Sequence, residues 1–196
     1  MKYIILLILS ISVGQSTTVK HLSVDNESSR IIWRGNKSTG AYHKGSINLI
    51  RGQIKLIDNN IIGGNILMDM TSITCNDIKD SSSNQSLVGH LKGEDFFSVE
   101  HFPNASLTLL EFNQSDDNIN DYLVAGELTI LDQTHPVEFT CSISISSDGA
   151  KADGIISVDR SIYGIKYKSK TWYKDLGDRF IEDTFYIYFS LIALPD

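Results

Sequence analysis

The sequence predicts an all-β protein whose strands form an eight-stranded antiparallel barrel. Apolar and polar residues alternate along most of the chain, and several alternating segments run for ten residues or more. A period of two places one face of a strand against a core and the other face against water. Long strands in one domain curl, and closure into a barrel removes the exposed edges of the sheet. We therefore expect a closed barrel with a short helical excursion near residues 83–97, where the alternation is absent.

The alternation divides the chain into eight expected strands. They cover residues 30–37, 42–56, 62–70, 107–109, 122–130, 137–145, 150–158 and 181–191. Gly52 is expected to mark a bulge in the second strand, and Asp148 and Gly149 to form a hairpin turn. A barrel of this size is wide enough inside for packed side chains or for one small ligand.

The segment without alternation is expected to form a helix and a turn. Ser83 and Asn84 are typical capping residues for a short helix that carries Leu87 and Leu91. The stretch 90–103 then gathers two histidines, three acids and three phenylalanines within 14 residues. Such a cluster fits either a metal or acid–base site or the lid of an apolar pocket.

Residues 1–16 have the pattern of a secretory signal peptide. Lys2 precedes the apolar run 3–13, and small residues at 14 and 16 predict cleavage near Ser16. The run is shorter than the roughly 20 apolar residues that span a bilayer. We therefore expect one domain, residues 17–196, that is exported to the periplasm or the cell exterior and has no integral membrane span.

The charge of the chain argues against two kinds of partner. The sequence has 17 basic and 24 acidic residues, a net charge of −7, and removal of residues 1–16 takes away only Lys2 and leaves −8. An acidic surface repels phosphate backbones, so no nucleic acid partner is expected. No basic run is present that would hold an anionic lipid surface. A homodimer is left open, as is a bridge between Cys75 and Cys141, each of which lies in or beside an apolar strand.

Motifs for catalysis and for metal binding are weak. None of the five histidines forms a His-x-His or HExxH pattern, and the chain has no Cys-x-x-Cys pair. No Gly-x-Ser-x-Gly elbow is present either. His90, Asp95 and His101 are the remaining candidates for a metal-assisted or hydrolytic site, and they could converge with His43 as a carboxylate–imidazole metal site. The simpler interpretation makes them loop residues that hold turns.

Arg160 is the most informative single charge. The alternation of its strand places it on the inward face, where a charge needs a partner. It either pairs with an acid, for which Asp159, Asp175 and Asp178 are candidates, or anchors the polar head of a ligand at the barrel mouth. Aromatic residues follow it in a loop, and such amphipathic rings suit the wet end of an apolar pocket.

The order of these residues matches the pattern of a known family. The matching positions are Val24-Asp25, Ser29, Ile31, Trp33, Gly35, Lys37, Gly40, His43, Gly45, Gly64, Asp69-Met70, Ser72-Ile73, His90-Leu91-Lys92, Asp95-Phe96-Phe97, Phe102-Pro103, Gly126, Leu128-Thr129-Ile130, Pro136-Val137, Arg160, Tyr163-Gly164-Ile165 and Gly177-Asp178. The chain thereby resembles the YceI-like, polyisoprenoid-binding family over nearly the whole of residues 17–196.

The resemblance implies a lipocalin-like barrel in an exported protein, with an internal tunnel for an isoprenoid or another long-chain amphiphile. It also implies a carrier or sequestering protein. Two segments depart from the family pattern, the Ser- and Asn-rich stretch 77–86 and the turn 131–135. The first departure puts an inherited head-group contact in that loop in doubt.

Together these observations predict a lipid carrier that binds an isoprenoid, quinone-like or long-chain acyl molecule without turnover. We expect no catalytic residue, no metal and no cofactor other than the bound lipid. The expected contacts with the apolar tail are Trp33, Ile47, Met68, Phe96, Phe97, Phe102, Val124, Leu128, Phe139, Ile156 and Phe185. The expected polar mouth consists of His43, His90, Asp95, Arg160 and Tyr163. The alternatives are the enzyme based on His90, Asp95 and His101, and an interaction module with no ligand.

Overall fold

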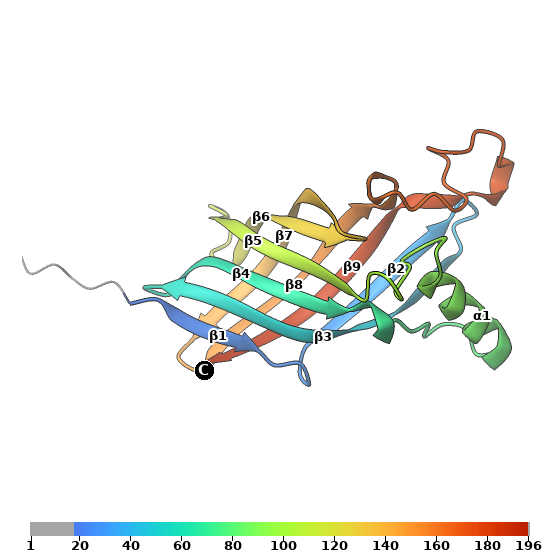
Figure 1. The fold of residues 1–196 in the computed structure, drawn as a ribbon. Helices are drawn as coiled ribbons and strands as arrows, with labels where there is room; N and C mark the ends of the chain where they lie inside the picture. Colours follow the sequence, from blue (N-terminus) through green and yellow to red (C-terminus); the bar gives the residue numbers. More distant parts are fainter. Residues whose placement is uncertain (1–17, 196) are drawn as a thin grey trace, which may run out of the picture.

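The predicted antiparallel barrel is confirmed in the computed structural model, which describes residues 18–195 (Figure 1). The expected signal peptide lies outside the described residues. Residues 18–195 form nine strands: β1 (Lys20–Val24), β2 (Arg30–Lys37), β3 (Tyr42–Ile57), β4 (Asn60–Asp69), β5 (Asn104–Gln114), β6 (Asp121–Ile130), β7 (Gln133–Ser146), β8 (Gly149–Asp159) and β9 (Ile181–Pro195). The helices are α1 (Ser81–Lys92) and the 3₁₀ turns η1 (Met70–Ser72), η2 (Arg160–Tyr163) and η3 (Gly177–Arg179).

The nine strands fill eight positions around the barrel. Neighbouring strands pair in the order β3-β2-β9-β8-β7-β6-β5-β4, and β4 pairs with β3 to close the ring. The strands β1 and β2 share one position, because both pair with β3 and with β9, at opposite ends. The strand β1 is not among the expected strands, because only two of its residues, Leu22 and Val24, are buried and show an alternation.

Two predictions about the strands need correction. The bulge in β3 lies at Ile50, where the register with β4 shifts between Leu49 and Arg51, and not at Gly52. A Cβ on Gly52 would come within 2.5 Å of Val24, so glycine there allows β1 to pack closely. The strand expected at 107–109 is part of the longer strand β5. A bulge between Leu109 and Glu111 interrupts the alternation of β5, so the sequence pattern indicates only a short strand.

The helix begins earlier than predicted. Asp80 is its N-cap and accepts a hydrogen bond from the amide of Ser83 at 2.8 Å, so Ser83 and Asn84 lie inside the helix. The Asn84 side chain donates to the carbonyls of Cys75 and Ile78 and ties the helix to the preceding loop. The helix lies at one end of the barrel, far from the C-terminus (Figure 1).

The core fills the inside of the barrel. The inward side chains of all nine strands form one apolar cluster, in which Leu22, Leu56, Val124 and Leu128 are almost completely buried. Both cysteines are free and buried. None of the helices in residues 18–195 is long and apolar enough to cross a membrane.

Candidate ligand cavity and its rim

Two cavities lie inside the barrel. The first, of about 70 Å³, lies toward the end that contains the C-terminus and is lined by residues such as Ile61, Ile143, Ala150 and Ala193. The second, of about 80 Å³, lies toward α1. We call them the distal cavity and the lid-side cavity. Each exceeds the roughly 15 Å³ that a water molecule needs, but apolar walls offer water few hydrogen bonds.

Three residues line both cavities. Met68 of β4, Leu128 of β6 and Ile187 of β9 belong to each lining, and they come from different parts of the barrel wall. We call these three residues the waist. The two cavities are therefore neighbours along the inside of the barrel, with the waist between them.

Ten of the eleven expected tail contacts line a cavity. Val124, Phe139 and Ile156 line the distal cavity, and Met68 and Leu128 line both. The residues on the lid-side cavity are Trp33, Ile47, Phe96, Phe97 and Phe185. Phe102 lines neither cavity; it is half-buried beside the ring of His101.

The segment 81–97, which we call the lid, covers the lid-side cavity with aromatic residues. The ring of Phe96 packs near Phe97, with centroids 6.4 Å apart, and both rings line the cavity. Phe96 also contacts the rings of His90 and Tyr167, at 5.0 and 5.5 Å. The lid is therefore joined to the loop after β8 through contacts between aromatic rings.

His90 and Asp95 hold the lid together from its outer side. The Nδ1 atom of His90 lies 3.7 Å from a carboxylate oxygen of Asp95, and neither side chain lines the internal cavities. His101 is exposed, and its Nδ1 lies 3.4 Å from the Ser98 hydroxyl. The trio His90, Asp95 and His101 does not bring three ligand atoms within reach of one ion. The structure thus gives no support to the metal site considered for this stretch.

Arg160 is buried and its donors are occupied by the protein itself. Its Nε atom donates to the carbonyl of Glu182, Nη1 to those of Ile165 and Tyr167, and Nη2 to that of Ile181. Nη2 also lies 3.3 Å from a carboxylate oxygen of Asp183. The partner acid is therefore Asp183, and not one of the three acids considered from the sequence.

The surroundings of Arg160 define its role. Burial acts to raise the pKa of the Asp183 carboxyl, but the Ser169 hydroxyl, hydrogen bonds from Thr171 and the charge of Arg160 hold the pKa below its ordinary value. Four carbonyls and one carboxylate surround a guanidinium that has five N–H donors. Arg160 thus joins the loop after β8 to the start of β9, and it lines the lid-side cavity without a free donor for a head group.

Tyr163 is also turned inward and is bound by the protein. Its side chain is 1% exposed, and its hydroxyl donates to the carbonyl of Leu128 at 3.2 Å. Burial raises the pKa of Tyr163 to about 12. The ring packs edge-on against His135 and lines neither cavity.

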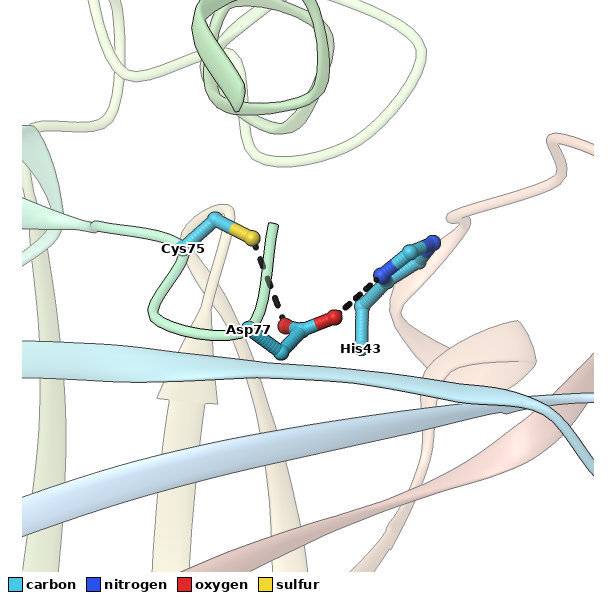
Figure 2. A group of neighbouring side chains, drawn as sticks. All are labelled: His43, Cys75 and Asp77. Atoms are coloured by element: carbon cyan, nitrogen blue, oxygen red, sulfur yellow. Dashed lines mark hydrogen bonds and ion pairs between the residues drawn. The ribbon is translucent and has the colours of Figure 1, made fainter. Parts of the chain in front are cut away.

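His43 belongs to a separate polar cluster that the sequence analysis did not recognise. Its Nδ1 lies 2.8 Å from one carboxylate oxygen of Asp77, and the thiol of Cys75 donates to the other at 3.4 Å. Figure 2 shows Asp77 between Cys75 and His43. Burial acts to raise the pKa of Asp77, yet hydrogen bonds from the Lys44 amide, His43 and Cys75 hold it below its ordinary value.

A glycine allows this cluster to form. The loop after η1 docks on β3, where the Thr74 amide donates to Ser46 and the Asn76 amide donates to Lys44. A Cβ on Gly45 would lie 1.7 Å from the Thr74 carbonyl oxygen, so any larger residue would push the loop away. The same carbonyl accepts a hydrogen bond from the Trp33 indole at 2.9 Å.

Comparison with known proteins agrees with this architecture. The family model described as a YceI-like domain matches residues 22–193 of this chain. The chain belongs to the YceI-like family. Among curated proteins no match is found.

Solved structures share the fold of this YceI-like barrel at low identity. Burkholderia cenocepacia BcnA has a TM-score of 0.67 at 20% identity, over 86% of this chain and 98% of that one. A polyisoprenoid binding domain from Saccharophagus degradans has a TM-score of 0.63 at 12% identity, over 91% of this chain and 100% of that one. At such identities the likeness concerns the fold.

Proposed function

We propose that this YceI-like barrel binds the apolar tail of a long-chain amphiphile, such as an isoprenoid, a quinone-like or a fatty-acyl molecule, and releases it unchanged. The observation that carries the proposal is the apolar interior, in which two cavities share the waist along the barrel. Its similarity in fold to a polyisoprenoid binding domain supports the same ligand class.

The energetics favour a long tail. Burial of one methylene contributes about 0.8 kcal/mol, so ten methylenes give roughly 8 kcal/mol before the costs of ordering are deducted. A tail in the lid-side cavity would contact Trp33, Phe96 and Phe185, and a longer tail would pass Leu128 and reach Phe139. Such burial supplies affinity without a covalent step.

The polar head would stay at the rim beside the lid. Arg160 has no free donor and Tyr163 is enclosed, so neither is proposed as a direct head contact. His43, 27% exposed in its side chain, and His90, 33% exposed, are partly exposed on the rim, where they pair with Asp77 and Asp95. We propose that the head group lies near His43 and His90 and is exposed to solvent.

A displacement assay tests the proposal. The delipidated protein is titrated with a fluorescent fatty acid, which is then displaced with isoprenoid alcohols and fatty acids of increasing length. We expect saturable binding at one site and tighter displacement as the tail lengthens. Probe fluorescence that does not saturate, or displacement that is independent of tail length, contradicts tail binding in the cavities.

Export is proposed on the sequence pattern of residues 1–16. The expectation is a mature chain that begins near Thr17 and is recovered outside the cytoplasm. N-terminal sequencing of the protein from cell fractions tests it. A full-length chain that stays in the cytoplasm contradicts it.

A further inference from the structure

We propose that His43, Cys75 and Asp77 form a binding site for a zinc-type divalent metal ion at the lid end of the barrel. The inference goes beyond the proposed function, because none of the three residues lines an internal cavity. The site shares only His43 with the rim proposed for the head group. The sequence contains no zinc motif, since the ligands lie on β3 and on the loop before α1, more than 30 residues apart.

The distances suit a small ion. One ligand atom from each residue lies within 4.8 Å of the other two, with the imidazole Nδ1 2.8 Å from a carboxylate oxygen. Tetrahedral zinc binds nitrogen and oxygen at about 2.0 Å and sulfur at about 2.3 Å, which separates neighbouring ligand atoms by roughly 3.3–3.5 Å. Side-chain shifts of about an ångström would therefore bring all three atoms to bonding distance.

The three groups are those that zinc prefers. Thiolate, imidazole and carboxylate all ligate zinc, and hard-cation sites contain no thiolate. The side chains of His43 and Asp77 are 27% and 22% exposed, so an ion has access from solvent and a water can complete the fourth position. Cys75 closes the site from the buried side.

The surrounding backbone holds the ligands in place before an ion arrives. The Lys44 amide donates to the second carboxylate oxygen of Asp77 at 2.8 Å and fixes its orientation. The Asn84 side chain donates to the Cys75 carbonyl at 2.8 Å, which ties the loop to α1. Such contacts around the ligands orient metal sites and strengthen them.

The binding step balances in protons. Cys75 binds as thiolate and releases its thiol proton to solvent. The proton that lies between Nδ1 of His43 and Asp77 leaves Nδ1, and neutral His43 carries its proton on Nε2 instead. Zinc thus replaces the hydrogen bonds that Asp77 makes with His43 and Cys75 by bonds to one ion, and neither oxidation nor a co-reactant is involved.

The test uses tag-free protein, stripped with a chelator and then titrated with Zn²⁺ against a chromophoric competitor, and separately with Co²⁺. We expect one ion per chain and a thiolate-to-cobalt absorption band. His43→Ala, Asp77→Asn and Cys75→Ser are each expected to weaken zinc by about 100-fold or more, because each removes a ligand. Cys141→Ser and His135→Ala are matched controls that should bind as the wild type does.

The outcomes are separable from misfolding. Each variant is compared by circular dichroism and by thermal melting with and without Zn²⁺, and only the wild type and the controls should gain stability from the ion. If Cys75→Ser fails to fold, His43→Ala provides the same test at the rim. A wild type that binds no zinc below millimolar concentration, a cobalt band that survives Cys75→Ser, or full binding by His43→Ala overturns the proposal.

Discussion

The hydroxyl of Tyr163 donates a hydrogen bond to the backbone carbonyl of Leu128, at 3.2 Å. The bond joins the turn that follows β8 to β6 at Leu128, one of the three waist residues, so a residue expected at the polar mouth stabilises the wall of the cavity. Tyr163→Phe keeps the ring and removes this bond. We expect a loss of about 1 kcal/mol in the free energy of unfolding, measured with denaturant. An unchanged free energy would show that the bond contributes nothing.

Arg160→Met tests the guanidinium as a structural clamp. The variant leaves four carbonyls and Asp183 without their donor inside the protein, and we expect a loss of about 3–5 kcal/mol in the free energy of unfolding. Lys174→Met removes a surface charge from the same loop and serves as the control. If Arg160→Met weakens ligand binding and leaves stability unchanged, the arginine is a head-group anchor.

The acid sensitivity of the fold depends in part on Asp183. Its pKa is lower in the folded protein than its ordinary value of 3.8, so its ionised form contributes stability at neutral pH. That contribution is complete above about pH 5 and declines as the pH falls through 3.8 toward the folded pKa. The stability difference between the wild type and Asp183→Asn should therefore shrink below pH 4. A difference that stays constant from pH 7 to pH 3 contradicts this linkage.

The waist predicts a dependence on tail length. Ile187→Phe enlarges a side chain shared by both cavities and narrows the passage between them. We expect overpacking to lower the free energy of unfolding by about 1–3 kcal/mol. The affinity for long tails should fall tenfold or more, while short tails keep their affinity in the lid-side cavity. Ile155→Phe, on the exposed outer face of β8, is the control. Equal weakening of short and long tails argues against a passage at the waist.

Gly45 can be tested against Gly35, which lies in the neighbouring strand. A Cβ at Gly45 would strike the Thr74 carbonyl, whereas a Cβ at Gly35 meets no atom within 4 Å. We expect Gly45→Ala to lower the free energy of unfolding by at least about 1–3 kcal/mol, and Gly35→Ala to change it little. Gly45→Ala should also weaken zinc, since the displaced loop carries Cys75 and Asp77. Equal stability of the two variants would contradict the close docking of the loop.

Much of the barrel could be predicted from local patterns. The segments 137–145 and 150–158 alternate cleanly, and each lies inside a strand of the structure. The strand β1 and the ends of β5 were not predicted, because a five-residue strand and a bulge weaken the period of two. The helix cap at Asp80 was not predicted, because Asp80 lies three residues before Ser83 and several residues before the first apolar position of the helix.

The site divides in the same way. Inward rows of strands identify cavity residues, so ten of the eleven tail candidates line a cavity. The roles of Arg160 and His43 depend on partners far away in the chain. Asp183 lies 23 residues after Arg160, and Asp77 lies 34 residues after His43, so only the pairing of β8 with β9 and the docking of the loop bring them together.

Native mass spectrometry of the purified protein, followed by extraction of any bound material into organic solvent, shows whether the barrel interior holds a long-chain ligand. We expect a mass shift that corresponds to one long-chain molecule per barrel, and recovery of that molecule chemically unchanged. Protein that carries no such molecule, and that also retains none after incubation with isoprenoid or acyl lipids, would contradict a ligand-binding interior.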